Sequence, residues 1–330
     1  MAPKVLLSEI KWAHEEAKEL FDGVADVLTI DKNMDRSSFI KELSPGGKYS
    51  EIVAIFRSYK APFGPYDKEL IDHFPPSLKW IASNGAGYDM VDVEALKAKG
   101  IHLSNTPSEV DDATATTALY LIIASMRQFS CAERSLRNMK WKPAGISAVS
   151  HDLTGKTLAI LGLGGIGLRI AEFVHAFPMR VIYHNRQKAV GAPEYCEYFE
   201  DVEEMLKQAD ILSISVPLNT RTTGLVGEKW IRTMKRGSII VNTARGKVLD
   251  EDALIRALED GHLASVGLDV LPNEPHVNPR LLEFPNITLL PHMGTETRDT
   301  QQKMEARALT NIRDYLVLGM GKDVVPEMRM

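Results

Sequence analysis

Three short segments of the 330-residue chain carry side chains suited to acid–base and electrophilic chemistry. They read VNTARG at 241–246, LDVLPNEP at 268–275 and LPHMGT at 290–295. An arginine can bind a carboxylate or polarise a carbonyl, a histidine can donate a proton to a developing alkoxide, and a carboxylate can orient the imidazole. Arg245, His292 and Glu274 together therefore predict hydride chemistry on a keto acid. Any one of them alone is more often an ordinary surface residue.

A glycine-rich segment, TLAILGLGGIGLRIA at 157–171, contains the pattern G-x-G-x-x-G between a predicted strand and a predicted helix. In such a unit Gly162 allows the tight turn, Gly164 lets the backbone approach a pyrophosphate, and Gly167 lets helix and strand pack closely. The N–H groups at the start of the helix attract phosphate. This context favours a dinucleotide site over a simple glycine turn of an α/β unit.

The segment RVIYHNRQK at 180–188 bears on which dinucleotide is bound. A NAD-binding unit usually has Asp or Glu at the end of its second strand, where the carboxylate bonds the ribose 2′-hydroxyl. Here Asn185 stands in that place, followed by Arg186 and Lys188. A carboxylate would repel a 2′-phosphate, whereas Asn and Arg can bond it, so the segment favours NADP(H) and leaves NAD(H) open. The alternative is a solvated, mildly basic loop.

The elements that must position these residues alternate between strands and helices. In residues 1–107, apolar runs and helical spacing predict strands at 4–7, 27–29, 52–56 and 78–82 and helices at 14–21, 37–43, 68–73 and 93–99. A long helix is predicted at 111–127, and helical spacing continues through 131–139. Another helix is predicted from the glycine-rich segment to about residue 177. A second series predicts strands at 158–161, 181–183, 211–216, 238–242, 265–270 and 287–290, with helices at 202–208, 228–234, 250–260 and 297–318.

This alternation predicts an α/β fold of two doubly wound parallel-sheet domains. The strands of the second series are continuously apolar, as expected when helices cover both faces of a sheet. We expect a Rossmann cofactor domain at 108–298, which would bind NADP. It would be inserted in a flavodoxin-like substrate-binding domain formed by 1–107 and 299–330.

Composition excludes several classes of protein. The chain is 44% hydrophobic and 25% charged, which is typical of globular proteins and not of disordered ones. Its net charge of −5 gives no basic field for nucleic acid. The two cysteines, Cys131 and Cys196, cannot build a disulfide framework or a four-thiolate zinc site, so we expect no metal and a cytoplasmic location. The longest apolar run, 118–124, is far shorter than the ~20 residues of a membrane helix, so no membrane association is expected.

Five motifs resemble those of the D-isomer-specific 2-hydroxyacid dehydrogenase family, over nearly the whole chain. They are GLGGIG with Ala171 at 162–171, ADILSISVPLN with Thr222 and Gly224-Leu225 at 209–225, MK-x-GSIIVNTARG at 234–246, GLDV-x-x-NEP at 267–275, and PH-x-GT at 291–295. Within this family the chain is similar to the glyoxylate/hydroxypyruvate reductases, particularly fungal ones. The Asn185-Arg186 pair and the stretches 85–93 and 110–116 carry that similarity.

The resemblance implies an NADPH-dependent reduction of a small 2-keto acid, glyoxylate or hydroxypyruvate, to the 2-hydroxy acid. Arg245 would bind and polarise the keto acid, His292 would donate the proton and Glu274 would be its partner. The loop 84–87 would bind the substrate carboxylate through the backbone of Ala86 and Gly87. A homodimer is implied as well. The implied cofactor contacts are Thr114, Gly165, Ile166, Pro217, Thr222, Thr243, Ala244, Asp269 and Thr295.

Two other functions are compatible with the sequence. The same three residues could serve a dehydrogenase of bulkier D-2-hydroxy acids, of mandelate, phenyllactate or branched-chain type, and the size of the pocket would decide this. A dinucleotide-sensing binding protein, like the co-repressors related to this family, would keep the fold without needing turnover. Oxidation of NADPH in the presence of glyoxylate distinguishes an enzyme from such a protein.

Overall fold

The computed structural model describes residues 2–58 and 63–329. The chain divides into two compact units, one formed by Met1–Val110 with Thr297–Met330 and the other by Asp111–Glu296. Each unit has one parallel sheet, of five strands in the first and seven in the second, with helices on both faces. The predicted α/β fold is therefore confirmed. No helix of the described residues is both long and apolar enough to cross a membrane.

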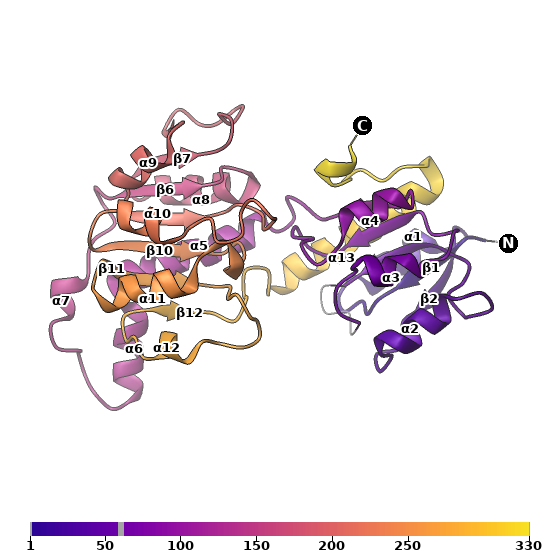
Figure 1. The fold of residues 1–330 in the computed structure, drawn as a ribbon, viewed down its shortest axis with the longest axis horizontal. Helices are drawn as coiled ribbons and strands as arrows, with labels where there is room; N and C mark the ends of the chain where they lie inside the picture. The colour runs from indigo at the N-terminus through magenta and orange to yellow at the C-terminus, as the bar shows by residue number, and fades with distance from the viewer. Residues whose placement is uncertain (1, 59–62, 330) are drawn as a thin grey trace. The chain divides into compact units, whose positions relative to one another are not determined.

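The first unit is built on a sheet with strand order β2-β1-β3-β4-β5. Along β1, Leu6 packs into the core on one face of this sheet, while Val5 and Leu7 pack into the core on the other face. This alternation explains why the strand is apolar throughout. Its elements are β1 Lys4–Leu7, α1 His14–Phe21, β2 Asp26–Thr29, α2 Arg36–Leu43, β3 Ile52–Arg57, α3 Lys68–Asp72, β4 Trp80–Ser83, α4 Val93–Ala98, β5 His102–Ser104 and α13 Arg298–Leu318 (Figure 1).

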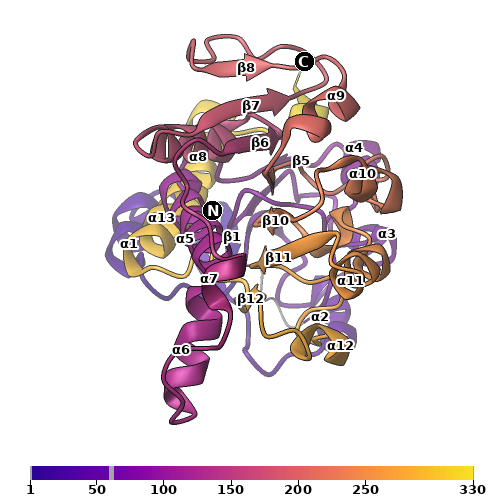
Figure 2. The same ribbon diagram turned by 90° about the vertical axis from the view of Figure 1, so that its left-hand side faces the viewer.

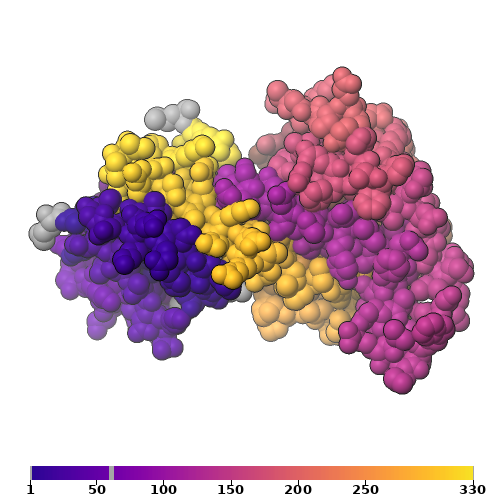
Figure 3. Space-filling view, turned by 180° about the vertical axis from the view of Figure 1, so that it is seen from behind, coloured from indigo at the N-terminus to yellow at the C-terminus, as the bar shows by residue number. Residues whose placement is uncertain are grey.

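The C-terminal helix α13 packs on the N-terminal part of this unit, as the yellow and indigo surfaces of Figure 3 show. Glu305 of this helix is only 3% exposed. Its carboxylate accepts N–H groups of Lys11 (3.0 Å), Trp12 (2.8 Å) and Ala13 (2.9 Å), at the start of α1. Because a buried charge is costly unless it is bonded, these contacts hold α13 against the N-terminal segment.

The second unit has a sheet with strand order β12-β11-β10-β9-β6-β7-β8. In Figure 2 the labelled strands of this sheet run from β12 at the bottom to β8 at the top. The order reverses at β6, which lies between β9 and β7, and open α/β sheets bind ligands at such a switch point. Its elements are α5 Asp111–Arg127, α6 Phe129–Arg137, α7 Ile146–Val149, β6 Thr157–Leu161, α8 Gly165–His175, β7 Arg180–His184, β8 Cys196–Tyr198, α9 Val202–Gln208, β9 Ile211–Ile214, α10 Glu228–Thr233, β10 Ser238–Asn242, α11 Glu251–Glu259, β11 Leu263–Leu268, α12 Pro279–Leu282 and β12 Thr288–Leu289.

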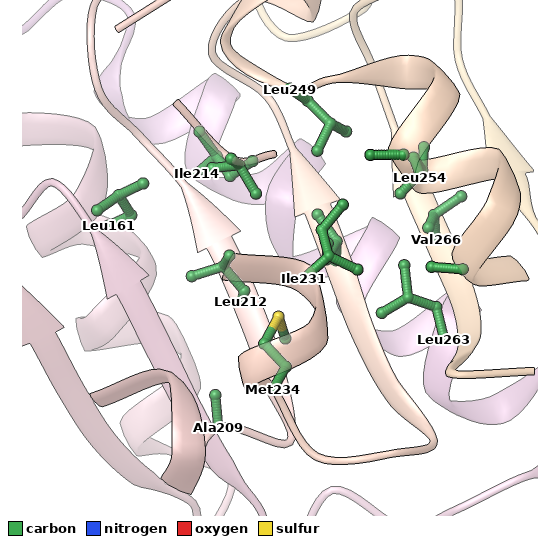
Figure 4. Close-up of a cluster of buried hydrophobic side chains, with 14 of the residues drawn as sticks. Leu161, Ala209, Leu212, Ile214, Ile231, Met234, Leu249, Leu254, Leu263 and Val266 are labelled. Atoms are coloured by element: carbon green, nitrogen blue, oxygen red, sulfur yellow. The ribbon is translucent and has the colours of Figure 1, made fainter. Parts of the chain in front are cut away.

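Two apolar cores cover the faces of the seven-stranded sheet. On one face, strand residues such as Leu212 and Ile214 pack against Ile231 of α10 and Leu254 of α11 (Figure 4). On the other face, α5 and α8 cover the sheet. Gly267 of β11 allows α5 to pack closely, because a Cβ there would lie 2.9 Å from the Cβ of Leu121.

Four short elements are absent from the predicted pattern: β5, β8, α7 and α12. Strands β5 and β8 have three residues each and lie at sheet edges, paired with β4 and β7 respectively. Helices α7 and α12 have four residues each. Segments this short show no periodicity, so tertiary pairing and packing decide their conformation.

Candidate active site

Arg245, Glu274 and His292 lie in the second unit, after the neighbouring strands β10, β11 and β12 respectively. The carboxyl ends of parallel strands meet at one edge of the sheet. There the Glu274 carboxylate lies 2.8 Å from Nδ1 of His292, and each side chain is 30% exposed. Glu274 thus binds Nδ1, and Nε2 is the ring nitrogen that faces away from it.

Glu274 is held in its ionised form. Burial by itself would raise its pKa, but the hydrogen bonds with His292 and with the Leu271 N–H, which donates to Oε1 at 2.9 Å, together with the charges of His292 and Arg245, lower the pKa below the ordinary value of 4.5. An anionic Glu274 stabilises a proton on His292. The pair can therefore store a proton for transfer.

The loop that carries Arg245 packs tightly against the one that carries Glu274. A Cβ on Gly246 would lie 2.0 Å from the carbonyl carbon of Leu271, so only glycine allows this approach. Asn242 fixes the loop from within, because its Nδ2 donates to the Arg245 carbonyl (3.0 Å) and its Oδ1 accepts the Ala244 N–H (3.0 Å). Asn242 was not among the predicted site residues, and no spacing in the sequence marks it.

Asp269, predicted as a cofactor contact, bonds the loop that carries His292. It is 1% exposed, and its carboxylate accepts the N–H groups of Met293 (2.6 Å) and Gly294 (2.9 Å). Burial raises its pKa, although those two hydrogen bonds oppose the shift. His292 has a φ of 56°, in the left-handed region that few residues adopt freely. Asp269 therefore shapes the strained turn. Thr114 contacts the same turn from α5, since its hydroxyl lies 3.4 Å from the Gly294 carbonyl oxygen.

We expect Glu274→Gln to move the alkaline limb of keto-acid reduction to lower pH. His292 is the expected proton donor, and a neutral glutamine removes the negative charge that lies beside its imidazole ring. In the wild type the pKa of Glu274 is lowered from its ordinary value of 4.5 by its hydrogen bonds and by the charges of His292 and Arg245, so its carboxylate is ionised throughout the neutral and alkaline range. The measurement is kcat/KM against pH for both proteins. Glu283→Gln, at an exposed position, is the control. An unmoved limb in Glu274→Gln contradicts the prediction.

The glycine-rich loop has the geometry of an anion site. Gly162 has a φ of 101°, and a Cβ on Gly167 would lie 2.2 Å from the Gly162 carbonyl oxygen. Gly164 precedes α8 and has open space where a Cβ would point. The first bond of α8 is donated by Leu168, and within the described chain the N–H groups of Gly165, Ile166 and Gly167 have no protein acceptor. A pyrophosphate fits this helix end.

Asn185 and Arg186 follow β7 beside this loop. The Asn185 side chain is bonded twice to Leu163, accepting its N–H at 2.7 Å and donating to its carbonyl at 3.3 Å. Asn185 therefore ties the glycine-rich loop to the end of β7. Arg186 is exposed, and so is Lys188. The sequence placed Asn185 at this site but did not reveal its bonds to Leu163.

The remaining predicted cofactor residues line the ends of neighbouring strands. Thr243, after β10, has a buried hydroxyl without a partner, which leaves a polar atom for a ligand. After β9, the Thr222 hydroxyl donates to the Pro217 carbonyl at 2.7 Å and closes that turn. Ala244 and Thr295 are partly exposed in their loops. No group of three His, Cys, Asp or Glu side chains that could hold a metal occurs in residues 2–58 and 63–329.

Ala86 and Gly87, the predicted substrate residues, belong to the first unit, after β4. Both are partly exposed. Throughout the part of the chain that the structure describes, their N–H groups donate to no protein acceptor. Two adjacent N–H groups of this kind can bind a carboxylate.

Comparisons with known proteins show which family the chain resembles. Residues 119–294 match the family described as D-isomer specific 2-hydroxyacid dehydrogenase, NAD binding domain. The chain is 39% identical to 4-methyl-2-oxopentanoate reductase A of Aspergillus oryzae, covering 100% of this chain and 99% of the relative. It is also 39% identical to glyoxylate reductase 1 of Saccharomyces cerevisiae, covering 93% and 90%.

A solved structure extends the similarity to three dimensions. The glyoxylate reductase from Paecilomyes thermophila superposes with a TM-score of 0.93 at 40% identity, and the match covers 99% of each chain. The resemblance carried by the five motifs is thereby confirmed. The chain belongs to the D-isomer specific 2-hydroxyacid dehydrogenase family, as an oxidoreductase with an NAD(P)-binding Rossmann domain.

Proposed function

We propose that the protein reduces a small 2-keto acid, glyoxylate or hydroxypyruvate, to the 2-hydroxy acid with NADPH. The observation that carries this is the bonded pair of Glu274 and His292 at the same sheet edge as Arg245. NADPH held at the glycine-rich loop would supply the hydride for C2 of the keto acid. Similarity to glyoxylate reductases supports the choice of substrate.

The chain's own residues supply binding, polarisation and the proton. The Arg245 guanidinium binds the keto acid and stabilises the negative charge that grows on its carbonyl oxygen. Protonated His292 donates from Nε2 to that oxygen, which becomes the hydroxyl of the product. Glu274 stabilises the imidazolium until the proton has moved. The N–H groups of Ala86 and Gly87 bind the carboxylate.

The preference for NADPH is assigned to Arg186. Its exposed guanidinium can form a charge-assisted bond with a 2′-phosphate, worth about 1.5–3 kcal/mol, or roughly ten- to a hundredfold. We expect Arg186→Ala to weaken the binding of NADPH by this factor and to leave the binding of NADH nearly unchanged. Kinetics with both cofactors at one ionic strength measure it, with Lys188→Ala as the control for a screened surface charge. Equal weakening of both cofactors would favour the solvated loop instead.

The double variant Asn185→Asp with Arg186→Ala should reverse the preference. A carboxylate repels the 2′-phosphate and can accept a bond from a free ribose hydroxyl. The structure adds a cost, because the Nδ2 atom that donates to the Leu163 carbonyl would be replaced by an oxygen. We therefore expect the double variant to bind NADH more tightly than NADPH. Its Kd values for NADH and for NADPH should both be higher than those of proteins that keep Asn185.

A second candidate substrate is a bulkier 2-keto acid. The support is the 39% identity to a 4-methyl-2-oxopentanoate reductase over the whole chain. Initial rates with glyoxylate, hydroxypyruvate, 4-methyl-2-oxopentanoate and phenylglyoxylate, each with NADPH and with NADH, decide between the two. A kcat/KM highest for glyoxylate or hydroxypyruvate supports the first proposal, and no turnover of any keto acid overturns both.

We propose that the protein is a homodimer through α5 and α6. The support is a set of exposed apolar side chains on and after these helices, which water-facing surfaces of monomers rarely gather. They are Tyr120, Phe129, Leu136, Met139, Trp141 and Val149, with Met139 at 95% and Trp141 at 82% exposure. Light scattering tests this, since a dimer has twice the chain mass of 36.7 kDa. A monomer mass at micromolar concentration would contradict it.

A further inference from the structure

The loop after β4 is held by the two residues that follow β5. The Gly85 N–H donates to the Thr106 hydroxyl (2.9 Å), and the Thr106 N–H donates back to the Gly85 carbonyl (3.0 Å). The Asn105 side-chain amide donates to the Ala86 carbonyl at 2.8 Å. Two consecutive carbonyl groups of the loop, those of Gly85 and Ala86, are thus bonded on the side of Asn105 and Thr106.

These bonds determine where the N–H groups of the loop point. A peptide unit is planar and trans, so its carbonyl and its N–H point in opposite directions. Bonding the Gly85 carbonyl fixes the direction of the Ala86 N–H, and bonding the Ala86 carbonyl fixes that of the Gly87 N–H. Both N–H groups are directed away from residues 105 and 106, and neither has a protein acceptor in the described chain.

Asn105 is itself held rigidly. It is 8% exposed, and its backbone N–H donates to the Asp323 carbonyl at 3.2 Å. The Asp323 carboxylate is bound in turn by the Arg307 guanidinium and, at 2.9 Å, by the Asn311 amide. The backbone that carries the Asn105 amide is therefore held by a bonded, largely buried group of residues, from which the amide donates to the loop.

We propose that Asn105 is a positioning residue, which aims the Gly87 N–H at the substrate carboxylate through its bond to the Ala86 carbonyl. Thr106 does the same for the Ala86 N–H through its own backbone. This inference rests on the proposed function, in which Ala86 and Gly87 bind a 2-keto acid by its carboxylate. Asn105 does not touch the substrate, so its effect should fall on carboxylate binding and not on proton transfer.

The test is Asn105→Ala, with Asn105→Asp as the variant that keeps the side-chain size. Losing the bond lets the Ala86–Gly87 peptide unit rotate, so we expect Asn105→Ala to raise KM for the keto acid about tenfold or more and to change kcat less than about threefold. An ionised Asp cannot donate and repels the Ala86 carbonyl, so Asn105→Asp should raise KM further. The pH dependence of kcat should stay that of the wild type, because neither variant changes the proposed proton donor or its partner Glu274.

A second readout does not need turnover. Oxalate carries a carboxylate but cannot be reduced, and its Kd for the protein with NADPH can be measured by fluorescence titration. We expect this Kd to rise in parallel with KM in both Asn105 variants, and the Kd of NADPH itself to stay unchanged. If the wild type reduces no keto acid, the proposed function fails, and the oxalate titration still decides the role of Asn105.

Ser104→Ala is the matched control. Ser104 is fully buried next to Asn105, and its hydroxyl accepts the Trp80 indole N–H at 3.1 Å, away from the loop. The same hydroxyl donates to the Ile81 carbonyl at 3.5 Å, so its loss removes two buried hydrogen bonds. It should leave KM and the oxalate Kd within about twofold of the wild type. The inference is overturned if both Asn105 variants keep the wild-type KM and oxalate Kd, or if Ser104→Ala raises them as much as Asn105→Ala does.

Discussion

Replacing His292 by asparagine should lower kcat for keto-acid reduction by about 10²–10⁴-fold, the usual contribution of a positioned general acid. His292 is bonded to Glu274 through Nδ1 and is the proton donor in the proposed reaction. Asparagine suits this position because the backbone φ of 56° lies in the left-handed region, which Asn tolerates. The turn held by Asp269 should therefore survive, and the measured loss should report proton transfer.

The control for this prediction is His276→Asn, in the loop that carries Glu274. His276 is exposed and has no part in the proposed reaction. We expect the kcat of His276→Asn to match that of the wild type. The Kd for NADPH should match the wild-type value in both His276→Asn and His292→Asn. A His292→Asn protein that keeps more than about a tenth of the wild-type kcat would mean that another group donates the proton.

Arg245→Lys should lower kcat/KM by more than about tenfold, or roughly 1.4 kcal/mol of transition-state stabilisation. Lysine keeps the positive charge but lacks the planar fork that forms two bonds with a keto acid. The Arg245 guanidinium donates to the Ala244 carbonyl at 2.8 Å, but the loop should persist without that bond, because Asn242 bonds the backbone of both Ala244 and Arg245. Steady-state kinetics with glyoxylate or the best substrate of the panel measure the effect.

Arg256→Lys serves as the comparison for Arg245→Lys. In the wild type the Arg256 guanidinium forms an exposed ion pair with Glu228 at 2.7 Å, and such surface pairs contribute little to stability. We expect wild-type kcat/KM in this variant and an unchanged Kd for NADPH in both. Turnover near the wild-type value in Arg245→Lys would remove Arg245 from the proposed mechanism.

Much of the fold follows from local pattern. The apolar runs of β6, β9 and β10 predict buried parallel strands, because a sheet covered on both faces needs apolar residues at every position. The short edge strands β5 and β8 do not follow from it. Three residues show no period, and their conformation depends on pairing with β4 and β7.

In the candidate site, too, some residues can be recognised from the local sequence and others cannot. Glycines and strand ends are visible in the sequence. Residue type and spacing alone therefore place Gly162, Gly164 and Arg245 on their loops and Gly167 in the first turn of α8. Residues that act through hydrogen bonds to distant backbone could not be recognised in this way. Asn242, which fixes the Arg245 loop, carries no local signal for that role.

The sequence by itself determined the α/β fold, the family and the chemical types gathered at the ends of β10, β11 and β12. These properties depend on residue type and spacing along the chain. Only the tertiary structure decided that Asp269 holds the turn of His292, that Asn185 is bonded to Leu163, and that Asn105 holds the loop after β4. The physical reason is that a side-chain amide or carboxylate is an ordinary surface group when water solvates it, but it fixes another segment of the chain when it bonds a buried backbone group there. Which of these holds depends on neighbours 19 to 25 residues away along the chain.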